Sequence, residues 1–237
     1  MGLDESSAAR DLHLSDGEIH FLWHFIQGSF MDPETRTRLR RGWGMCPRHS
    51  LGFLAVDAAF RHAFPHGPAI LYEDLMSQAH AAFSLSGPFR AERTGFHLRA
   101  TGPCHMCDLG YGPASPGQAS REILERGRNL TEIRRFALAT EPYWRRAVCG
   151  RCAGNGSTRR CRIHLREGLI AGADPGDHVA LVQDIAHHIR RYSRSFVWEL
   201  QDTETVEDRA ALVAAVGWCS GWRPWLWLVG WSVHEPD

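Results

Sequence analysis

Residues 149–164 read Cys-Gly-Arg-Cys-Ala-Gly-Asn-Gly-Ser-Thr-Arg-Arg-Cys-Arg-Ile-His, and this segment decides how we expect the chain to fold. It contains two pairs of candidate metal ligands, Cys149 with Cys152 and Cys161 with His164. In each pair a gap of two residues lets a single turn direct both side chains at one ion. The loop between the pairs is short, so closing it costs little chain entropy. The segment therefore predicts a local metal site, a zinc knuckle.

Two further pairs, Cys46-x-x-His49 and Cys104-x-x-Cys107, repeat this spacing elsewhere in the chain. Together the four pairs leave only one of the seven cysteines, Cys219, unassigned. Thiolate and imidazole ligands favour Zn2+ over harder ions such as Mg2+ or Ca2+. We therefore expect two Cys3His sites and two zinc ions per chain, rather than scattered buried thiols. The predicted metal ligands are Cys46, His49, Cys104, Cys107, Cys149, Cys152, Cys161 and His164.

The spacing leaves open how the four pairs combine into two sites. In the local combination, which the cost of loop closure favours, all ligands of one site come from residues 149–164. The remaining pairs then form a long-range site that joins the first helical segments to a later linker. In the rival combination, the pair Cys104-x-x-Cys107 shares an ion with Cys161 and His164.

The overall composition is that of an ordinary globular protein, with 237 residues, 43% of them hydrophobic and 23% charged. The 27 basic residues balance 27 acidic ones, and this argues against nucleic acid or acidic lipid as the main partner. Every basic residue is arginine, which excludes Schiff-base lysines and the Walker phosphate loop and suggests a bacterial origin. No secretory signal opens the sequence, and no apolar stretch is long enough to span a bilayer. We therefore expect a cytoplasmic protein, in which clustered cysteines indicate metal chemistry before disulfides.

Hydrophobic periodicity predicts a mainly α fold. Asp32-Pro33-Glu34 has the pattern of a helix start, with an N-cap acceptor, a proline at the first helical position and an acid near the positive end of the helix dipole. This helix should end near Gly42 or Gly44.

Further helices are expected over residues 51–62, 71–84, 119–139 and 177–200, with another beginning after Thr205. Pro65 and the step Gly67-Pro68 should separate the first two of these helices. Thr205 and Asp208 form a capping-box pattern at the start of the last one.

The chain divides into two predicted halves. Residues 86–118 are rich in glycine and proline and are expected to form a linker with an embedded pair of ligands. We assign residues 1–100 to an N-terminal helical half that carries Cys46 and His49, and residues 101–237 to a C-terminal half with the zinc knuckle and further helices. Two structural zinc ions would link these two helical halves.

The tail from Trp218 to Trp231 contains five of the nine tryptophans. Its last part is apolar on both faces, with Trp225, Trp227 and Trp231 in period-2 register. We expect a short buried C-terminal strand or an extended segment over the helices, and the alternative is an exposed patch for a partner or a membrane interface.

Several runs resemble an uncharacterised bacterial family of helical, Cys/His-rich proteins, the domain of unknown function DUF6062. The resemblance rests on the run from Phe30 to His49, which ends Gly-Trp-Gly-Met-Cys-Pro-Arg-His, and on Ala69-Ile-Leu-Tyr-Glu-Asp-Leu75. The runs 196–200 and 207–217 are similar to the closing segment of that family. The expected first Cys-x-x-Cys of the family is missing here, and the first pair of the knuckle looks like an addition. The resemblance implies a helical fold and bound metal, and it implies no activity.

Candidate ligands outside the four pairs are fewer. His20 and His24 lie four residues apart, so on a helix they share one face and could hold a metal ion. Two ordinary histidines are the simpler interpretation, because no third ligand is evident. A basic face opposite the apolar stripe of the helix over 177–200 is a candidate site for a phosphate or carboxylate. Its residues are His187, Arg190, Arg191 and Arg194.

The ligand count favours a structural role for both metals. A structural zinc has four protein ligands, whereas a catalytic zinc keeps one position open. Pro103-Cys-His-Met-Cys107 matches half of the zinc-deaminase signature, but the upstream His-x-Glu that carries the proton is missing. No catalytic residue can be assigned from these patterns.

Three functions follow from this sequence. The first is a zinc-binding adaptor or binding module for another protein or a small anionic ligand. The second is a zinc-dependent enzyme in which a Cys-ligated zinc activates water or a thiolate. The third, a nucleic-acid-binding zinc protein, is disfavoured by the neutral charge.

Overall fold

The computed structural model describes residues 13–60 and 65–231, and all regular secondary structure in these residues is helical. The α-helices are α2 (Asp16–Phe25), α3 (Pro33–Gly42), α4 (Pro47–Phe60), α5 (His66–Phe83), α6 (Arg90–His97), α7 (His105–Asp108), α8 (Arg121–Gly127), α9 (Thr131–Trp144), α10 (Gly150–Ala153), α11 (Arg162–Ile170), α12 (Gly176–Arg194), α13 (Val206–Ser220) and α14 (Arg223–Val229). The short 3-10 helices between them are η1 (Ser29–Met31), η2 (Arg145–Ala147) and η3 (Trp198–Leu200). The predicted mainly α fold is confirmed, and it carries two Cys3His clusters.

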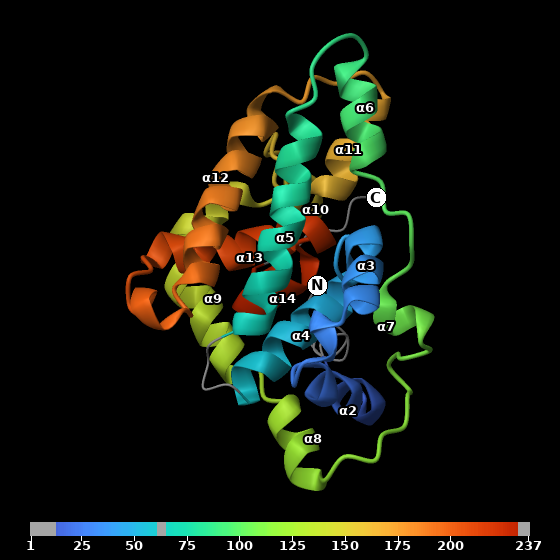
Figure 1. Cartoon of the computed structure of the whole chain (residues 1–237), viewed down its shortest axis with the longest axis vertical. Helices are drawn as coiled ribbons and strands as arrows, with labels where there is room; N and C mark the ends of the chain where they lie inside the picture. The colour runs from blue at the N-terminus through green and yellow to red at the C-terminus, as the bar shows by residue number, and fades with distance from the viewer. Residues whose placement is uncertain (1–12, 61–64, 232–237) are drawn as a thin grey trace, which may run out of the picture.

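Helix α13 lies at the centre of the molecule. In Figure 1 it runs between α5 on one side and α9 and α12 on the other, and it packs against all three. All its residues from Ala210 to Ser220 are buried. A helix that is covered on every side must be apolar all round, as this stretch of alanine, valine and leucine is.

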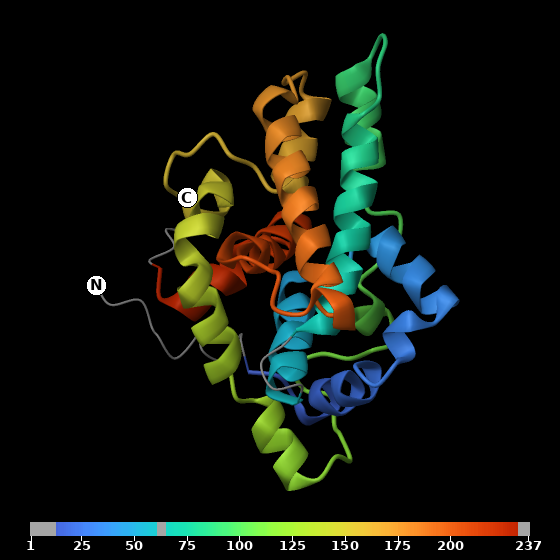
Figure 2. The same cartoon turned by 60° about the vertical axis from the view of Figure 1, so that its left-hand side comes forward.

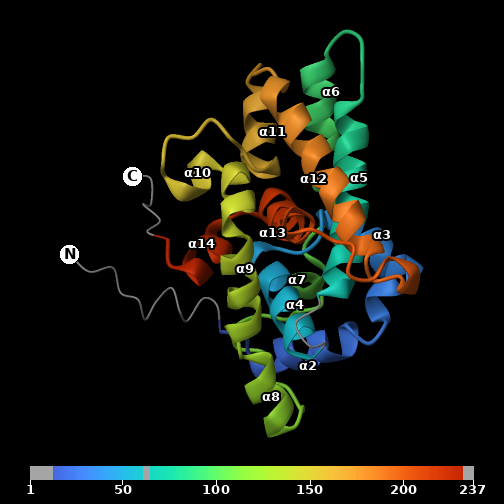
Figure 3. The ribbon, with the colours of Figure 1, turned by 90° about the vertical axis from the view of Figure 1, so that its left-hand side faces the viewer.

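Helices from distant parts of the chain surround α13. Figure 2 shows α5 and α12 side by side along most of their length, and Figure 3 shows α9 on the opposite flank with α8 below it. The buried residues of these helices form one hydrophobic cluster that draws on both predicted halves of the chain. The division into residues 1–100 and 101–237 remains a prediction. No helix within the described ranges is long and apolar enough to cross a membrane.

Two of the predicted helix starts are confirmed. The carboxylate of Asp32 accepts a hydrogen bond from the backbone N–H of Thr35, at 2.9 Å, and Pro33 opens α3. That helix ends at Gly42, as expected, although Trp43 rather than a glycine takes the left-handed cap, with φ of 58°. The capping box at the start of α13 also forms as predicted.

The predicted C-terminal strand is wrong. Residues 223–229 form helix α14, with Pro224 in its first turn, and Trp225 is buried while Trp227 is partly exposed. A short run that is apolar on all sides fits a buried helix as well as a buried strand, so its periodicity could not separate the two. The segment reaches this position because Gly217 leaves room for the Trp222 ring, which would lie 2.6 Å from a Cβ added there.

Other element boundaries also differ from the prediction. The expected linker over residues 86–118 contains helix α6, and the expected helix over 119–139 is divided into α8 and α9. Gly67 and Pro68 lie in the first turn of α5 rather than between helices. Backbone N–H groups in a first turn have no intrahelical acceptor, so proline, which lacks an N–H, loses no hydrogen bond there. The predicted stripe position His62 and most of the polar N-terminal segment lie outside the described residues.

Asp208 joins the start of α13 to α12. Its buried carboxylate accepts hydrogen bonds from the Thr205 backbone N–H at 2.9 Å, from His188 at 2.7 Å and from Arg191 at 3.2 Å. Burial opposes ionisation of the carboxyl group, but these donors hold its pKa below the ordinary value.

We predict that Asp208→Asn lowers the free energy of unfolding at pH 7 by about 2–3 kcal/mol, because a buried charge is removed from its donors. Since the folded-state pKa is lowered, the wild-type advantage is present above the unfolded pKa of about 4 and is lost as the pH falls through the folded value. Urea unfolding of both proteins from pH 7 to pH 3 measures this difference. The control Glu125→Gln, at an exposed carboxylate of α8, should change stability by less than about 0.5 kcal/mol. Equal stabilities of wild type and Asp208→Asn at pH 7 would contradict the assignment.

Candidate metal centres

The first cluster joins the start of α4 to α7, and its residues are Cys46, His49, Cys104 and Cys107. The four ligand atoms lie within 4.8 Å of one another. His49 Nδ1 is 3.3 Å from the sulfurs of Cys46 and Cys104. The Cys107 sulfur is 3.4 Å from the same nitrogen and 3.9 Å from the sulfur of Cys46.

The second cluster is local and joins α10 to α11, and its residues are Cys149, Cys152, Cys161 and His164. His164 Nδ1 is 3.2 Å from the sulfur of Cys149 and 3.5 Å from that of Cys152. The Cys161 sulfur is 3.3 Å from this nitrogen and 3.8 Å from the sulfur of Cys152. The pairs are therefore grouped as in the local combination, not the rival one.

The spacing in both clusters fits a single tetrahedral ion. With the usual Zn–S and Zn–N bond lengths, a tetrahedral zinc places its sulfur ligands about 3.8 Å apart and sulfur and nitrogen about 3.6 Å apart. The observed separations, from 3.2 to 3.9 Å, are close to these values. All seven cysteines are free thiols, and the sulfur separations are far beyond a disulfide bond of about 2 Å. Each cluster is therefore a set of four ligands that one ion can satisfy.

All four ligand pairs share one construction: the first ligand directly precedes a helix and the second lies in its first turn. Cys104, Cys149 and Cys161 are the N-cap residues of α7, α10 and α11, and Cys46 precedes α4. Backbone N–H groups at a helix start have no intrahelical acceptor, so they favour a thiolate placed there. Each cluster thus lies where two helix N-termini meet.

A close approach of the backbone builds the second cluster. The N–H of Gly150 donates to the carbonyl of Arg159 at 2.9 Å, which folds the loop between the ligand pairs back over α10. A Cβ at position 150 would lie 2.0 Å from the carbonyl oxygen of Ser157, so only glycine fits there. This contact brings Cys161 beside the first pair.

Crowding of the thiols makes a bound cation favourable. In the first cluster the Cys46 and Cys104 sulfurs compete for a proton, which lowers the pKa of Cys104 and raises that of Cys46. In the second cluster the same competition lowers the pKa of Cys149 and raises that of Cys161. One thiolate forms easily in each group, and further thiolates are opposed by its charge. A divalent ion removes that opposition and allows all three thiols to ionise.

Glu18 orients the imidazole of the first cluster. Its side chain is fully buried, and one oxygen accepts from His49 Nε2 at 2.9 Å. The Arg48 guanidinium binds both oxygens of the same carboxylate, at 2.7 and 2.8 Å. Burial alone would raise the pKa of Glu18, but the hydrogen bonds from Arg48 and His49 outweigh it and hold the pKa well below the usual range. Because Nε2–H is held by the carboxylate, Nδ1 is left to face the sulfurs, as a metal-ligating histidine requires.

Sequence reasoning missed this role of Glu18. The residue completes a capping box with Ser15 at the start of α2, and a local pattern of that kind is visible in the sequence. Its contact with His49, by contrast, depends on how α2 packs against α4. Within the described part of the chain, no carboxylate is bonded to His164, so the second cluster has no equivalent partner.

The two clusters differ in access to solvent. Cys149, Cys152 and Cys161 are buried, so the second cluster is closed on its sulfur side. In the first cluster the side chain of Cys107 is exposed. The seventh cysteine, Cys219, is buried against Met76, where burial raises its pKa to about 12, and it takes no part in either cluster.

His20 and His24 form no metal group with other described residues. Their rings lie 5.0 Å apart on α2, as the spacing predicts. His20 Nδ1 instead accepts the backbone N–H of Gln118 at 3.0 Å. No third histidine, cysteine or carboxylate ligand joins them among residues 13–60 and 65–231.

The predicted anion-binding face of α12 lies against carboxylates of the chain itself. Arg191 is bonded to Asp208, and the Arg190 guanidinium lies 3.7 Å from Glu73. His187, one turn before Arg191, and Arg194, one turn after it, are exposed. Binding of an external anion by His187, Arg190, Arg191 and Arg194 stays a prediction.

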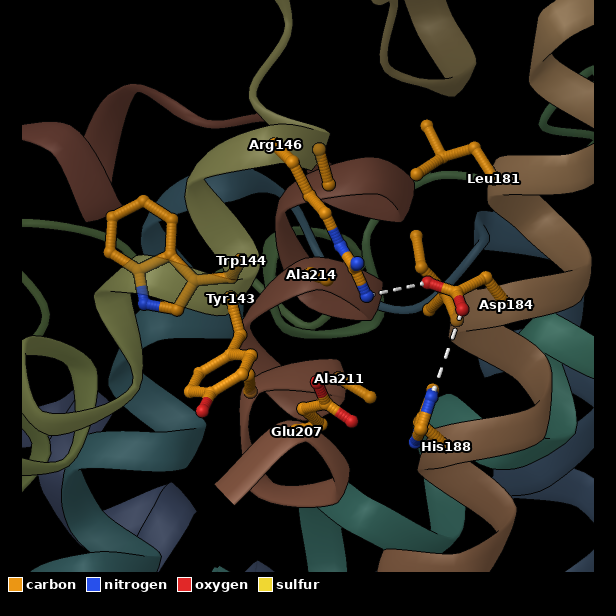
Figure 4. A pocket seen from close by; sticks show the side chains of 12 residues that line it. Tyr143, Trp144, Arg146, Leu181, Asp184, His188, Glu207, Ala211 and Ala214 are labelled. Atoms are coloured by element: carbon orange, nitrogen blue, oxygen red, sulfur yellow. Dashed lines mark hydrogen bonds and ion pairs between the residues drawn. The ribbon is translucent and has the colours of Figure 1, made fainter. Parts of the chain in front are cut away.

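Figure 4 shows the small cavity beside this face, where α9, α12 and α13 meet. Arg146 reaches across from η2, directly after α9, to Asp184 of α12, at 3.0 Å, and His188 lies 3.7 Å from the same carboxylate. The space enclosed is about 20 Å³. This is room for about one water molecule and excludes a substrate-sized ligand.

We predict that Glu18→Gln weakens metal binding at the first cluster by about 10- to 100-fold, because the imidazole loses the charge that fixes its orientation. Glutamine retains the capping box, so α2 should still form. Competition against a chromophoric chelator measures both affinities in the same titration. The second cluster serves as the internal reference, and Glu167→Gln, at an exposed partner of Arg151, should leave both affinities unchanged. Unchanged affinity at the first cluster would show that Glu18 only packs.

Cys161→Ser should reduce the metal content from two ions to one and disorder only the neighbourhood of the second cluster. Zinc binding contributes on the order of 10 kcal/mol to the folding of such a loop, so its loss should expose the amides of residues 149–164. Hydrogen exchange combined with metal counting tests this. Cys219→Ala, at the buried cysteine that is not a ligand, is the control and should retain both ions. Loss of protection around residues 100–110 in Cys161→Ser would instead require a shared site.

No protein-family model, curated protein or solved structure matches this chain. The resemblance to the DUF6062 family therefore stays a hypothesis. The function has to be argued from the two clusters and the surfaces that they hold in place.

Proposed function

We propose that this protein is a zinc-binding helical module whose two metal ions are structural and whose task is to bind a protein or a small anionic ligand. One observation carries the proposal. Eight cysteine and histidine side chains from four helix starts converge into two complete groups of four, with no ligand missing from either group. A site with four protein ligands has no position left for water or substrate, which is the condition of a structural zinc.

The donor set supports zinc in particular. Three thiolates and one imidazole in a tetrahedral arrangement are typical ligands of Zn2+ and are poor ligands of Mg2+ or Ca2+. The orientation of His49 by a buried carboxylate is a further property of zinc sites in proteins.

The positions of the clusters support a structural role. The first ion would join α4 to α7, which are connected in sequence only through the two intervening helices α5 and α6. The second would hold α10 and the loop that follows it against α11. Helices α7 and α10 have four residues each, too few to be stable alone, so they need such a link.

A second candidate function rests on the exposed side chain of Cys107. A zinc-bound thiolate that faces solvent can act as a nucleophile, as an enzyme with an activated thiolate requires. Alkylation of the zinc-loaded protein distinguishes this candidate. Selective modification of Cys107 with both ions retained would favour the enzyme, and resistance of all ligand thiols would favour the structural role.

Protein purified without chelator should contain two zinc ions per chain, and cobalt substitution should give the intense visible absorption of two tetrahedral thiolate sites. Removal of the metal should lower the helix content and thermal stability, since the binding energy of structural zinc is coupled to folding. Elemental analysis, circular dichroism and absorption spectra measure these properties. One ion or none per chain would contradict the two-site proposal. A weakly absorbing cobalt site of higher coordination number would show an open position and favour catalysis.

A further inference from the structure

An open groove of about 460 Å³ lies between α3, α5 and the end of α6. We call it the arginine groove. In Figure 1 the chain leaving α6 descends past α3 on its way to α7. Arg99 and Thr101, which line the groove, belong to this connection. The residues that line the groove include Thr37, Arg40, Arg41, Phe96, Arg99 and Thr101.

Hydrogen bonds fix the two walls of the groove. The N–H of Thr101 donates to the carbonyl of Arg41 at 2.8 Å, and the Trp43 indole N–H donates to the carbonyl of Arg99 at 3.2 Å. Gly42 lies so close to the second wall that a Cβ there would be 2.9 Å from the Pro103 carbonyl oxygen. These contacts therefore fix the position of the segment after α6 relative to the end of α3.

The groove has an excess of positive charge that the neutral chain as a whole does not show. It is lined by three guanidinium groups and by no carboxylate. Arg40 lies 3.1 Å from Asp74, an acid that Arg36 also binds. Within the described residues, Arg41 and Arg99 form no ion pair. Two cationic side chains and the hydroxyl of Thr101 are thus available to an anion, whereas the Thr37 hydroxyl donates to the carbonyl of Pro33 at 2.8 Å.

An exposed aromatic ring accompanies this charge. The Phe96 side chain is 63% exposed, although a phenylalanine is usually buried. The Arg99 guanidinium lies over its ring, 5.1 Å from the centroid. Arginine with an accessible ring is the combination by which proteins bind a phosphate and stack a nucleobase.

We propose that the arginine groove binds a nucleoside phosphate, with the phosphate at Arg41 and Arg99 and the base against Phe96. This assignment of a nucleoside phosphate rests on the proposed function, because it identifies the small anionic ligand that the binding module would take. The guanidinium groups provide charge-assisted hydrogen bonds to phosphate oxygens, and the volume accommodates a nucleotide. The face of α12, by contrast, has two of its arginines beside Asp208 and Glu73.

A metal ion in the first cluster would hold both walls of this groove. The wall formed by α3 leads through Trp43 to Cys46, and the wall after α6 leads through Pro103 to Cys104. Both walls therefore end in ligands of one cluster. Loss of that ion should separate the walls and weaken nucleotide binding, whereas loss of the second ion should not.

Titration calorimetry on the zinc-loaded full chain tests the proposal. The probes are the four nucleoside 5′-monophosphates, inorganic phosphate, the free nucleosides and a short oligodeoxythymidylate. We expect at least one monophosphate to bind at least fivefold more tightly than inorganic phosphate and than its own nucleoside. Much tighter binding of the oligonucleotide would identify a single strand as the source of the nucleoside phosphate, and equal affinity would identify the free nucleotide.

Paired variants assign the binding to the groove. Arg41→Gln with Arg99→Gln should lower the affinity for the monophosphate at least tenfold. The control Arg121→Gln with Arg135→Gln removes the same charge from exposed positions on α8 and α9 and should leave it unchanged. Phe96→Ala should remove the preference for nucleotide over phosphate, and Phe96→Tyr should retain it.

The outcomes separate the two proposals. If the zinc content is two and no monophosphate binds, or phosphate binds as tightly as the nucleotides, the groove assignment is overturned and the structural zinc proposal stands. If the control pair weakens binding as much as the groove pair, the binding is unspecific and the assignment is likewise wrong. Zinc content below two would count against the proposed function itself. Thermal melting curves show whether each variant is folded, so that affinities are compared only between folded proteins.

Discussion

The repulsion among closely packed thiolates is the constraint on which the rest of this structure depends. Three sulfurs and one imidazole nitrogen are held within 4.8 Å in each cluster, a spacing that fits one cation but not three bare negative charges. The elements that carry these ligands include two single-turn helices and long irregular connections. Helices of that length have no independent stability in water. A cation at each cluster would turn these weak segments into fixed walls.

The remainder of the fold is stabilised by different means. Around α13 the helices bury a continuous apolar cluster, and the hydrophobic effect stabilises this packing. Glu18 connects the two parts, since the same carboxylate completes the start of α2 and holds both Arg48 and His49. The packing of α2 on α4 and the geometry of the first cluster are therefore coupled through one buried charge.

Features encoded by short spacings could be predicted from the sequence. The ligand pairs, the N-cap at Asp32 and the capping box at Thr205 depend on residues three positions apart, and the structure contains all of them. The local grouping of the knuckle ligands could be favoured because loop closure is cheaper over a short loop.

Features that depend on tertiary contacts could not be predicted in this way. Trp225 belongs to a helix rather than a strand because α14 packs against α4 and α9, and a run apolar on all sides carries no period to show it. Helix α6 was obscured by the glycines and prolines around it, and its buried face is short, with Thr94 and Gly95 against neighbouring elements. The arginine groove combines residues of α3, α5 and α6, so no single stretch of sequence contains its pattern.

The central position of α13 has a consequence for how the protein is made. A ribosome delivers residues in chain order, so α4, α5, α9 and both metal clusters have emerged before α13 begins at Val206. Until then the apolar sides of these helices that pack on α13 remain uncovered, and exposed surface of this kind promotes aggregation of nascent chains. The clusters, whose ligands are all present once His164 has left the ribosome, would give the unfinished chain an ordered frame. Supply of metal during translation, rather than after it, would then determine how much of the newly made protein reaches the folded state.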